Sequence, residues 1–375
     1  MILTEQHRQF QEKLRDFAQN EVAPVAKELD KQAKFSWDLF HRMGELELLG
    51  IPIPKEYGGA GLDTLSYAIA VEEVGRVCGS TGIVLAAHTS LSCYPIYIAG
   101  NEEQKKKWLV PLARGEKAGA FGLTEPDAGS DAAATKTTAK LVGDKYVING
   151  TKRFITSGYI GEIVPFVATE DPSKRHHGIS AFVVEKGTPG FSPGRDEDKL
   201  GLKGSYTSEL IFEDCTIPKE NRLGASGEGF KMFMQTLDGG RISIGALALG
   251  IAQGALDASI KYVKEAGASL KESQLVQGLI ADMATYIEAA RGLIYDAAVL
   301  KDKDLPLTKI AAMAKLYASE IGMWVCSKAV ELHGVQGLTR KYPVERFMRD
   351  EKLMEIGEGT SEIQRIVIAR QILGR

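Results

Sequence analysis

Lys145-Tyr146-Val147-Ile148-Asn149-Gly150-Thr151-Lys152-Arg153-Phe154-Ile155-Thr156 is the stretch that decides the fold. Its two halves are rich in β-branched and aromatic residues, and they flank Asn149-Gly150, a dipeptide typical of a two-residue β-turn. The stretch therefore predicts a β-hairpin. Short runs of similar composition, separated by Gly, Pro and Asp, follow at 164–168, 179–185 and 209–212. We expect a small all-β domain over residues 119–229.

Both flanks of this β domain carry helical patterns. Before it, Phe10, Leu14 and Phe17 fall on one helical face at spacings of four and three. After it, four long helices joined by short links are expected at 237–263, 272–300, 308–332 and 361–373, which is typical of a bundle. The chain is thus predicted to be mainly α with a central β domain. The expected parts are an N-terminal α-helical domain at 1–118, the β domain at 119–229 and a C-terminal four-helix bundle at 230–375.

Composition excludes several classes of protein. The 375 residues carry a net charge of -3, so no basic face for nucleic acid is expected. The four cysteines are scattered without metal-ligand spacing, which favours a reduced compartment and no metal site. Residues 1–7 lack the pattern of a secretory signal or transit peptide, and no apolar run approaches membrane-spanning length. We expect no membrane partner, and a location in a bacterial cytoplasm or, second, in an organelle matrix.

One carboxylate near the C-terminus stands out, in Gly357-Glu358-Gly359. The glycines allow a tight turn and bring a ligand close to the main chain. Ser361 with Gln364 fits a capping box, so a helix is expected to begin here. A base beside the positive end of a helix dipole suits proton abstraction next to an anionic or electron-poor ligand. Taken alone, the segment still favours a glycine-rich turn with a solvated glutamate.

Four segments together resemble the acyl-CoA dehydrogenase family. Each is weak alone, but their order and their placement on the β domain, the start of the bundle and its end are specific. The resemblance covers essentially the whole chain and is strongest to the short-chain, butyryl-CoA branch. The segments are Phe121-Gly122-Leu123-Thr124-Glu125-Pro126-Asp127-Ala128-Gly129-Ser130-Asp131, residues 149–156, Gln235-Thr236-Leu237-Asp238-Gly239-Gly240-Arg241 and the Glu358 loop.

The resemblance implies a middle β-barrel domain, FAD between that domain and the bundle, and a homotetramer. It implies α,β-dehydrogenation of a short or branched or cyclic acyl-CoA thioester, with electron-transfer flavoprotein as the usual acceptor. Glu358 matches the family's base, which removes the Cα proton while the flavin accepts hydride from Cβ. Some relatives carry their base immediately before the Arg that matches Arg241; Gly240 stands there, so only Glu358 is available.

Other roles carry over by position. Residues that match contacts to the flavin ring are Leu123, Thr124, Phe154, Ile155 and Thr156. Residues that match flavin contacts at the last helix N-terminus are Thr360, Ser361 and Glu362. Gln274 matches a contact to the neighbouring subunit's FAD. Residues that match contacts to the CoA thioester are Ser130, Asp238, Arg241 and Gly359.

Three departures from the family pattern stand out, and two of them fall at the cross-subunit FAD contacts. In the family, seven residues, among them an Arg, separate a Tyr from the next Gly. In this chain only four residues lie between the matching Tyr262 and Gly267, so the Arg is missing. Glu331 replaces a Gln, which is repulsive to a pyrophosphate, and Val335 replaces a Gly. Gly357 replaces a frequent aromatic residue.

The departures leave alternatives open beside an ordinary FAD-dependent dehydrogenase. In the first alternative, FAD is bound weakly through rearranged contacts, such as Lys261 or Lys264. In the second, a different subunit completes the FAD site in a hetero-oligomer. Alternatively, the protein is flavin-free and uses Glu358 for proton chemistry alone, as an acyl-CoA isomerase, hydratase or lyase. A non-catalytic partner subunit is a further interpretation, but the retained Glu358 argues against it.

Overall fold

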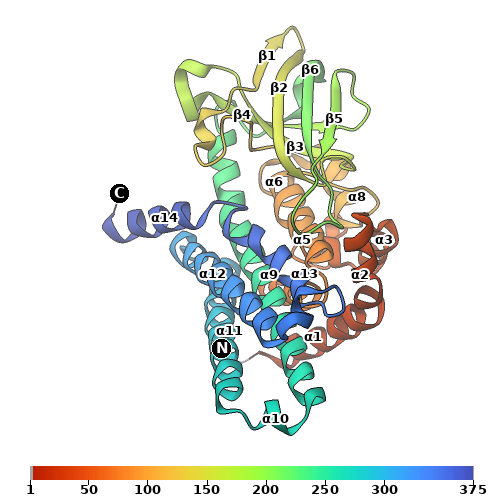
Figure 1. Cartoon of the computed structure of the whole chain (residues 1–375). Helices are drawn as coiled ribbons and strands as arrows, with labels where there is room; N and C mark the ends of the chain where they lie inside the picture. Colours follow the sequence, from red (N-terminus) through yellow and green to blue (C-terminus); the bar gives the residue numbers. More distant parts are fainter. Residues whose placement is uncertain (1–2, 375) are drawn as a thin grey trace.

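The computed structural model describes residues 3–374; Met1, Ile2 and Arg375, which belong to the expected domains at the two ends, lie outside the described residues. The chain passes from helices into a sheet and back into helices (Figure 1). The sheet forms one end of the molecule, and the helices of both flanks pack together below it. The architecture expected from the sequence is confirmed.

The N-terminal helices are capped by side chains that the sequence places before them. The side-chain oxygens of Thr4, Ser36 and Asp63 accept from backbone N–H groups at the starts of α1, α3 and α4. Leu14 and Phe17 are buried, as their spacing predicts. The helices are α1 (Glu5–Phe17), α2 (Ala23–Gln32), α3 (Trp37–Glu45), α4 (Thr64–Gly75), α5 (Gly79–Ala87), α6 (Tyr94–Ala99), α7 (Glu102–Gln104) and α8 (Val110–Ala113).

Within residues 3–374, seven strands form one sheet in the order β5-β6-β2-β1-β3-β4-β7. Neighbouring strands are antiparallel except β1 and β3, which share a short parallel contact at Thr138 and Thr169. The strands are β1 (Thr138–Val142), β2 (Lys145–Thr156), β3 (Ile163–Thr169), β4 (Ile179–Glu185), β5 (Phe191–Asp196), β6 (Thr207–Pro218) and β7 (Arg222–Leu223).

The hairpin expected at Asn149-Gly150 is wrong, because residues 145–156 form the single strand β2. The pairing of β2 with β6 shifts register at Gly150, whose φ is +146°. A side chain there would come within 2.7 Å of Thr137 Cα. The Asn149 side chain accepts from Asp214 N at 2.8 Å, so this dipeptide serves a β-bulge. The two-residue turn lies instead at Gly143-Asp144, between β1 and β2.

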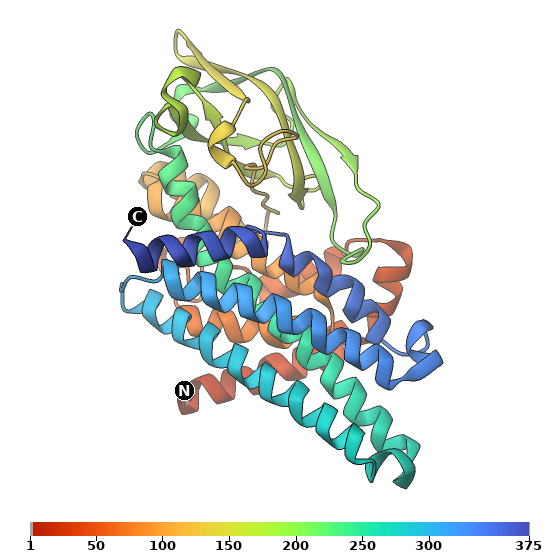
Figure 2. The same cartoon turned by 60° about the vertical axis from the view of Figure 1, so that its left-hand side comes forward.

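The bundle is built from long helices whose bounds the sequence largely predicts. α12 (Thr308–Leu332) and α14 (Ser361–Leu373) begin and end where expected. α12 packs against α9, α11 and α14 (Figure 2). The short α13, preceded by Pro343, was not expected. The remaining elements are α9 (Gly229–Ala266), α10 (Ala268–Lys271), α11 (Gln274–Asp302) and α13 (Val344–Glu351).

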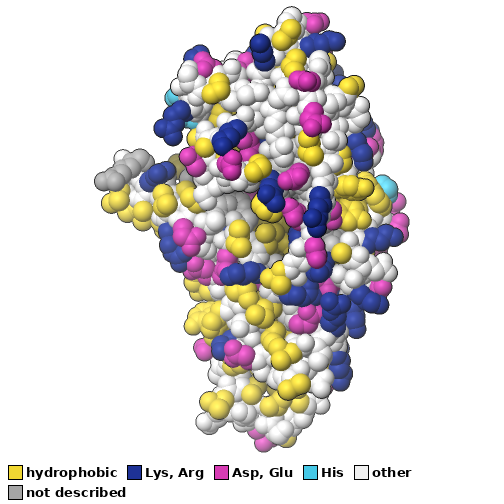
Figure 3. All heavy atoms as spheres, turned by 45° about the horizontal axis from the view of Figure 1, so that its top comes forward, with side chains coloured by type: hydrophobic (Ala, Val, Ile, Leu, Met, Phe, Trp, Pro, Cys, Tyr) yellow, Lys and Arg dark blue, Asp and Glu magenta, His cyan; other side chains and the backbone are white. Residues whose placement is uncertain are grey.

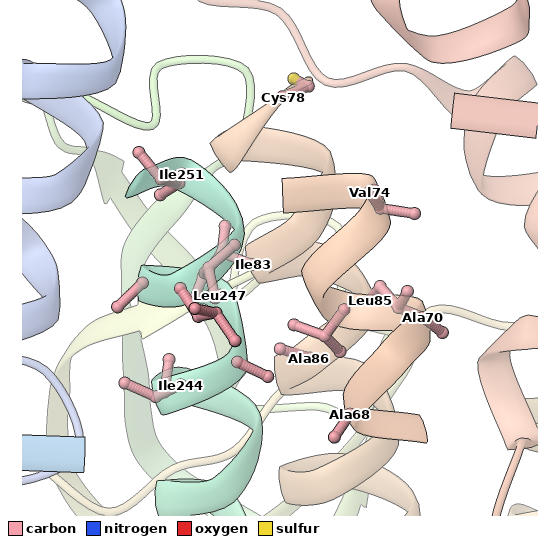
Figure 4. Packing of buried hydrophobic residues seen from close by; sticks show 14 of the residues in the cluster. Ala68, Ala70, Val74, Cys78, Ile83, Leu85, Ala86, Ile244, Leu247 and Ile251 are labelled. Carbon is pink, nitrogen blue, oxygen red and sulfur yellow. The ribbon is translucent and has the colours of Figure 1, made fainter. Parts of the chain in front are cut away.

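The largest core joins the two helical parts. Leu247 of α9 lies beside Ile83 of α5 (Figure 4), and Ile251 and Ala86 belong to the same cluster. Each of these side chains is almost fully buried, and burying a Leu or Ile is worth roughly 1.5–3 kcal/mol. This packing fixes α9, which carries several candidate site residues, against the N-terminal helices.

Two helical stretches, Gly79–Ala99 and Gly229–Ala266, are long and apolar enough by composition to cross a membrane. The expectation that no apolar run reaches such a length is therefore wrong. Most of each apolar window is buried inside the protein, as in core helices. On the face in Figure 3, side chains of both charge signs are interspersed, and no single-sign patch dominates.

Glu351 on α13 is a buried carboxyl whose removal should stabilise the protein. It is fully buried against Gly322 of α12, and neither carboxyl oxygen has a hydrogen-bond partner within residues 3–374. Burial raises the pKa of Glu351 well above its ordinary value, so the folded state must hold a proton that the unfolded state releases. Stability is then lost as pH rises through the interval between the two pKa values, at about 1.4 kcal/mol per pH unit.

We expect Glu351→Gln to unfold at a higher temperature than the unaltered protein at pH 8, with a smaller difference at pH 5. Thermal unfolding followed by circular dichroism at both pH values measures this. The exposed Glu103→Gln on α7 is the control and should show no pH-dependent gain. A gain for Glu351→Gln that is equal at both pH values would contradict the buried-proton account.

Candidate active site

Glu358 lies on the loop that leads into α14, in a backbone conformation that its neighbours hold in place. Its φ is +54°, in the left-handed region that costs a non-glycine residue roughly 1–3 kcal/mol. Gln364 Nε2 donates to the carbonyl oxygens of Glu358 at 3.3 Å and of Gly359 at 3.0 Å. Lys315 Nζ on α12 donates to the Gly359 carbonyl at 2.7 Å. Two buried side chains therefore anchor the loop from two helices.

The Glu358 carboxylate points at α9. Its Oε2 atom is enclosed and has no hydrogen-bond partner within the described chain. It lies so close to Gly240 that a side chain there would overlap it. Burial raises the pKa of Glu358 to about 7, although the charges of Lys315 and Arg241 partly offset this. Such a group is half ionised near neutral pH, which suits a general base.

Helix α14 begins at Ser361, as expected, but the predicted capping box is wrong. Thr360 is the N-cap: its φ and ψ are -60° and 163°, and its Oγ1 accepts from Ile363 N at 3.3 Å. The Gln364 side chain binds the loop carbonyls instead of reaching back to an N-cap N–H. The Ser361 hydroxyl is left buried and without a partner among residues 3–374.

Arg241 on α9 lies near Glu358 and is held in a short network. Its Nη1 donates to Asp238 Oδ1 at 2.5 Å, and Asp238 Oδ2 accepts from Thr308 Oγ1 at 2.7 Å. Burial lowers the pKa of Arg241, and the charges of Asp238 and Glu358 act in the opposite direction. Arg241 Nε is buried and finds no acceptor in the described residues. The pair with Asp238 thus leaves the buried Nε–H of the guanidinium available to a ligand.

The β-domain residues expected at a flavin ring come from two segments that lie side by side. Arg153 N donates to the Thr124 carbonyl at 2.8 Å. The buried Lys152 donates to the Leu123 carbonyl at 3.2 Å and to Glu125 at 2.6 Å. Residues 123–124 and 154–156 are thereby held together. Their side chains differ, since Phe154 is 60% exposed with a φ of +56° while Ile155 packs in the sheet core.

Because its side chain packs in the sheet core, Ile155 can contact a ligand only through its backbone. Thr124 and Thr156 are half-buried, Ser130 and Glu362 are exposed, and Thr360 and Gly359 lie in the Glu358 loop.

The structure does not bring Gln274 to this site. Gln274 starts α11 beyond the far end of α9 (Figure 1), whose last residue, Ala266, lies about 39 Å along the helix axis from Gly240. The departures at the cross-subunit FAD contacts lie at the same far end, because Tyr262 stacks on His333 at 4.3 Å between ring centres, next to Glu331 and Val335. The third departure, Gly357, lies instead beside Glu358. Glu331 pairs there with Lys328, and Val335 is exposed.

Sequence reasoning missed Lys315 and Gln364. Lys315 falls in the expected helix 308–332 on a stripe of small residues, Ala311, Ala318 and Gly322, at helical spacing. A lysine in the middle of such a stripe is the signal that would have found it. In the part of the chain that is described, no three His, Cys, Asp or Glu side chains gather as metal ligands.

Comparison with known proteins agrees with this arrangement. Residues 4–116, 120–215 and 227–373 match, in order, the N-terminal, middle and C-terminal domains of acyl-CoA dehydrogenases. The chain belongs to the acyl-CoA dehydrogenase family. It is therefore an enzyme of the oxidoreductase class.

Individual relatives of this family member are similar over their whole length. The short-chain specific acyl-CoA dehydrogenase of Clostridium acetobutylicum is 52% identical, with 99% of this chain and 98% of that protein aligned. Butyryl-CoA dehydrogenase from Megasphaera elsdenii superposes with a TM-score of 0.97 at 43% identity, covering 100% and 99% of the two chains. A chain of the electron transferring flavoprotein structure from Acidaminococcus fermentans superposes with a TM-score of 0.98 at 51% identity, with both chains covered completely.

The residues present fit the FAD that the family resemblance implies. Phe154 offers an open aromatic face, although large apolar side chains are usually buried. The Ser361 hydroxyl at the N-terminus of α14 lacks a partner within residues 3–374, and buried hydroxyls normally have one. A helix N-terminus also favours electron-rich groups. An apolar, hydrogen-bonding ring system would satisfy all three features.

Proposed function

We propose that this acyl-CoA dehydrogenase oxidises a short acyl-CoA thioester, straight, branched or cyclic, with Glu358 as the base that removes the Cα proton. The observation that carries the proposal is the enclosed Oε2 atom of the half-buried Glu358, which lies against Gly240 and has no hydrogen-bond partner in the described chain. The 52% identity to a short-chain specific relative supports the short acyl group. The domain limits proposed with it remain 1–118, 119–229 and 230–375.

The thioester needs donors and a place for its CoA chain. The Glu358 backbone N–H donates to no backbone carbonyl among residues 3–374, so it is free to stabilise negative charge on the thioester oxygen. Arg241 and Asp238 lie on the adjacent face of α9 and would bind the pantetheine part, with Ser130 and Gly359 as further contacts. Arg241 is a cation on the proposed course of the CoA chain, and its charge would attract the phosphates of CoA.

We propose that FAD occupies the site formed by residues 123–124, 154–156 and the start of α14. When bound, FAD supplies the acceptor for the hydride that leaves Cβ. Phe154 would pack on the ring, while the hydroxyls of Thr124, Thr156 and Ser361 would hydrogen-bond its polar edge. Thr360 and Glu362 flank Ser361, and Gln274 would serve a neighbouring subunit's FAD.

The protein is proposed to act in the cytoplasm as a homotetramer that passes electrons to an electron-transfer flavoprotein. Exposed apolar residues on the projecting α14, Ile366, Ile372 and Leu373, support assembly (Figure 1). A hetero-oligomer with a related chain that carries the missing Arg is the second candidate. The observation that favours it is the carboxylate of Glu331, exposed at the bundle end where the resemblance places a pyrophosphate.

We expect FAD to be held weakly. The loss of one charge-assisted contact costs roughly 1.5–3 kcal/mol, or about 10- to 150-fold in Kd. Dialysis followed by a visible spectrum should show flavin lost from the purified protein, and Glu331→Gln should retain more of it. The exposed Glu103→Gln is the control. Stoichiometric FAD that survives dialysis in the unaltered protein would contradict this expectation.

The reaction itself is tested by dye reduction with butyryl-, octanoyl- and palmitoyl-CoA in the presence of added FAD. Butyryl-CoA should be oxidised fastest. If no acyl-CoA reduces the dye, the proposal of a homo-oligomeric dehydrogenase fails. Addition of a related chain that carries the missing Arg then separates the hetero-oligomer, which becomes active, from the flavin-free interpretation.

A further inference from the structure

Lys315 occupies a position where stability alone would not place a lysine. It lies in the middle of α12, fully buried on a stripe of small residues, and its backbone packs against Gly245 of α9. Its Nζ donates a single hydrogen bond within the described residues, to the Gly359 carbonyl. An ammonium has three N–H donors, and a buried one costs several kcal/mol when it is incompletely paired. A methionine of similar length would fill this space without that cost.

The hydrogen bond of Lys315 falls on the segment that shapes the base. Gly359 directly follows Glu358, and both residues have positive φ values, +54° and +98°. Gln364 donates to the carbonyls of both residues from α14, and Lys315 adds a second anchor on the Gly359 carbonyl, from α12. Releasing one anchor lets Glu358 relax toward the ordinary helical or extended regions, which would swing its carboxylate away from Gly240.

The charge of Lys315 also acts on Glu358. The charged groups around the pair are Arg241 on α9, already paired with Asp238, and Glu351 and Glu355 after α12, of which Glu355 pairs with Lys352. Tyr67 on α4 donates its hydroxyl to the Ala86 carbonyl, and burial, with the charge of Glu358, raises its pKa. No carboxylate forms a direct ion pair with Lys315 among residues 3–374. Its positive charge is therefore available to the Glu358 carboxylate.

We propose that Lys315 is a positioning residue for the base: it anchors the Gly359 carbonyl, which holds Glu358 in its left-handed conformation, and it stabilises the ionised carboxylate. The proposal rests on the proposed role of Glu358. Burial lowers the pKa of Lys315 to about 8, so the lysine is still mostly charged at pH 7.

Three variants separate charge from packing. Lys315→Met removes both the charge and the hydrogen bond, Lys315→Gln keeps a donor for Gly359, and Lys315→Arg keeps the charge. Loss of the charge should raise the pKa of Glu358 by about one to three units, because an opposite charge nearby favours the ionised form. The acid limb of the profile of kcat/KM against pH should move to higher pH in Lys315→Met and Lys315→Gln. It should stay at the same pH in Lys315→Arg. The exposed Lys309→Met on the same helix is the control.

A second readout needs neither cofactor nor substrate. The infrared band of the protonated Glu358 carboxyl, identified by its absence in Glu358→Gln, is titrated in each Lys315 variant. A higher midpoint in Met and Gln than in the unaltered protein supports the proposal; identical midpoints overturn it. This result is distinct from failure of the proposed function, which would show as full activity in Glu358→Gln whatever the infrared titration gives.

Discussion

Glu358→Gln should lower the rate of acyl-CoA oxidation by about 10²–10⁴-fold or more, the usual contribution of a general base, while the protein stays folded. The amide fits the same enclosed space beside Gly240 but cannot accept the Cα proton. Steady-state kinetics with butyryl-CoA measure the loss. Glu320→Gln, which removes a surface ion pair with Arg365, is the matched control and should be nearly unchanged.

The pH dependence follows from the same carboxyl. Only the ionised form of Glu358 can accept a proton, and its pKa is raised to about 7. Activity of the free enzyme, measured as kcat/KM, should therefore fall as pH drops through about 7 and level off above it. An acid limb near the ordinary pKa of a glutamate would mean that the carboxylate is solvated when it reacts.

Gly240→Ala should reduce kcat by about 10²-fold, because displacement of a reacting group by about 1 Å can have that effect. The added methyl group would clash with Glu358 Oε2, the end of a flexible side chain, so the carboxylate moves and the helix remains. Alanine also favours helix over glycine by about 1 kcal/mol. We expect a folded protein of equal or higher thermal stability with a misplaced base.

The matched control is Gly278→Ala on α11, where an added methyl group meets nothing within 4 Å. It should gain helix stability and keep full activity. Full activity in Gly240→Ala would show that the carboxylate reacts from a different position. Moving the base, with Gly240→Glu in the background of Glu358→Gly, should recover part of the activity lost in Glu358→Gly alone.

The sequence predicts the architecture well because long helices leave a clear periodicity. The bounds of α12 and α14 agree with expectation, and β4 does as well. The short α13 was not predicted, because one or two turns of helix after Pro343 are hard to distinguish from a loop in the sequence. Asn149-Gly150 led to the wrong prediction of a hairpin. The same dipeptide that favours a hairpin turn also suits a β-bulge, and only the pairing of β2 with β6 decides between them.

The site could be predicted in part. Glu358 and its glycines were visible as a motif, but the enclosure of the carboxylate beside Gly240 depends on α9 and α14 meeting in space. Ser361 with Gln364 satisfied the capping pattern, yet Gln364 is used on the loop carbonyls because the positive φ values of Glu358 and Gly359 turn those carbonyls toward it. Local patterns do not contain such contacts between distant segments.

The most direct test of Glu358 as the base follows the Cα proton itself. Butyryl-CoA is incubated with the FAD-loaded protein in deuterated water without an electron acceptor, and deuterium at Cα is measured by mass spectrometry. The unaltered protein should incorporate deuterium, and Glu358→Gln should not do so above the rate without protein. Incorporation by Glu358→Gln at the rate of the unaltered protein would contradict the assignment of the base.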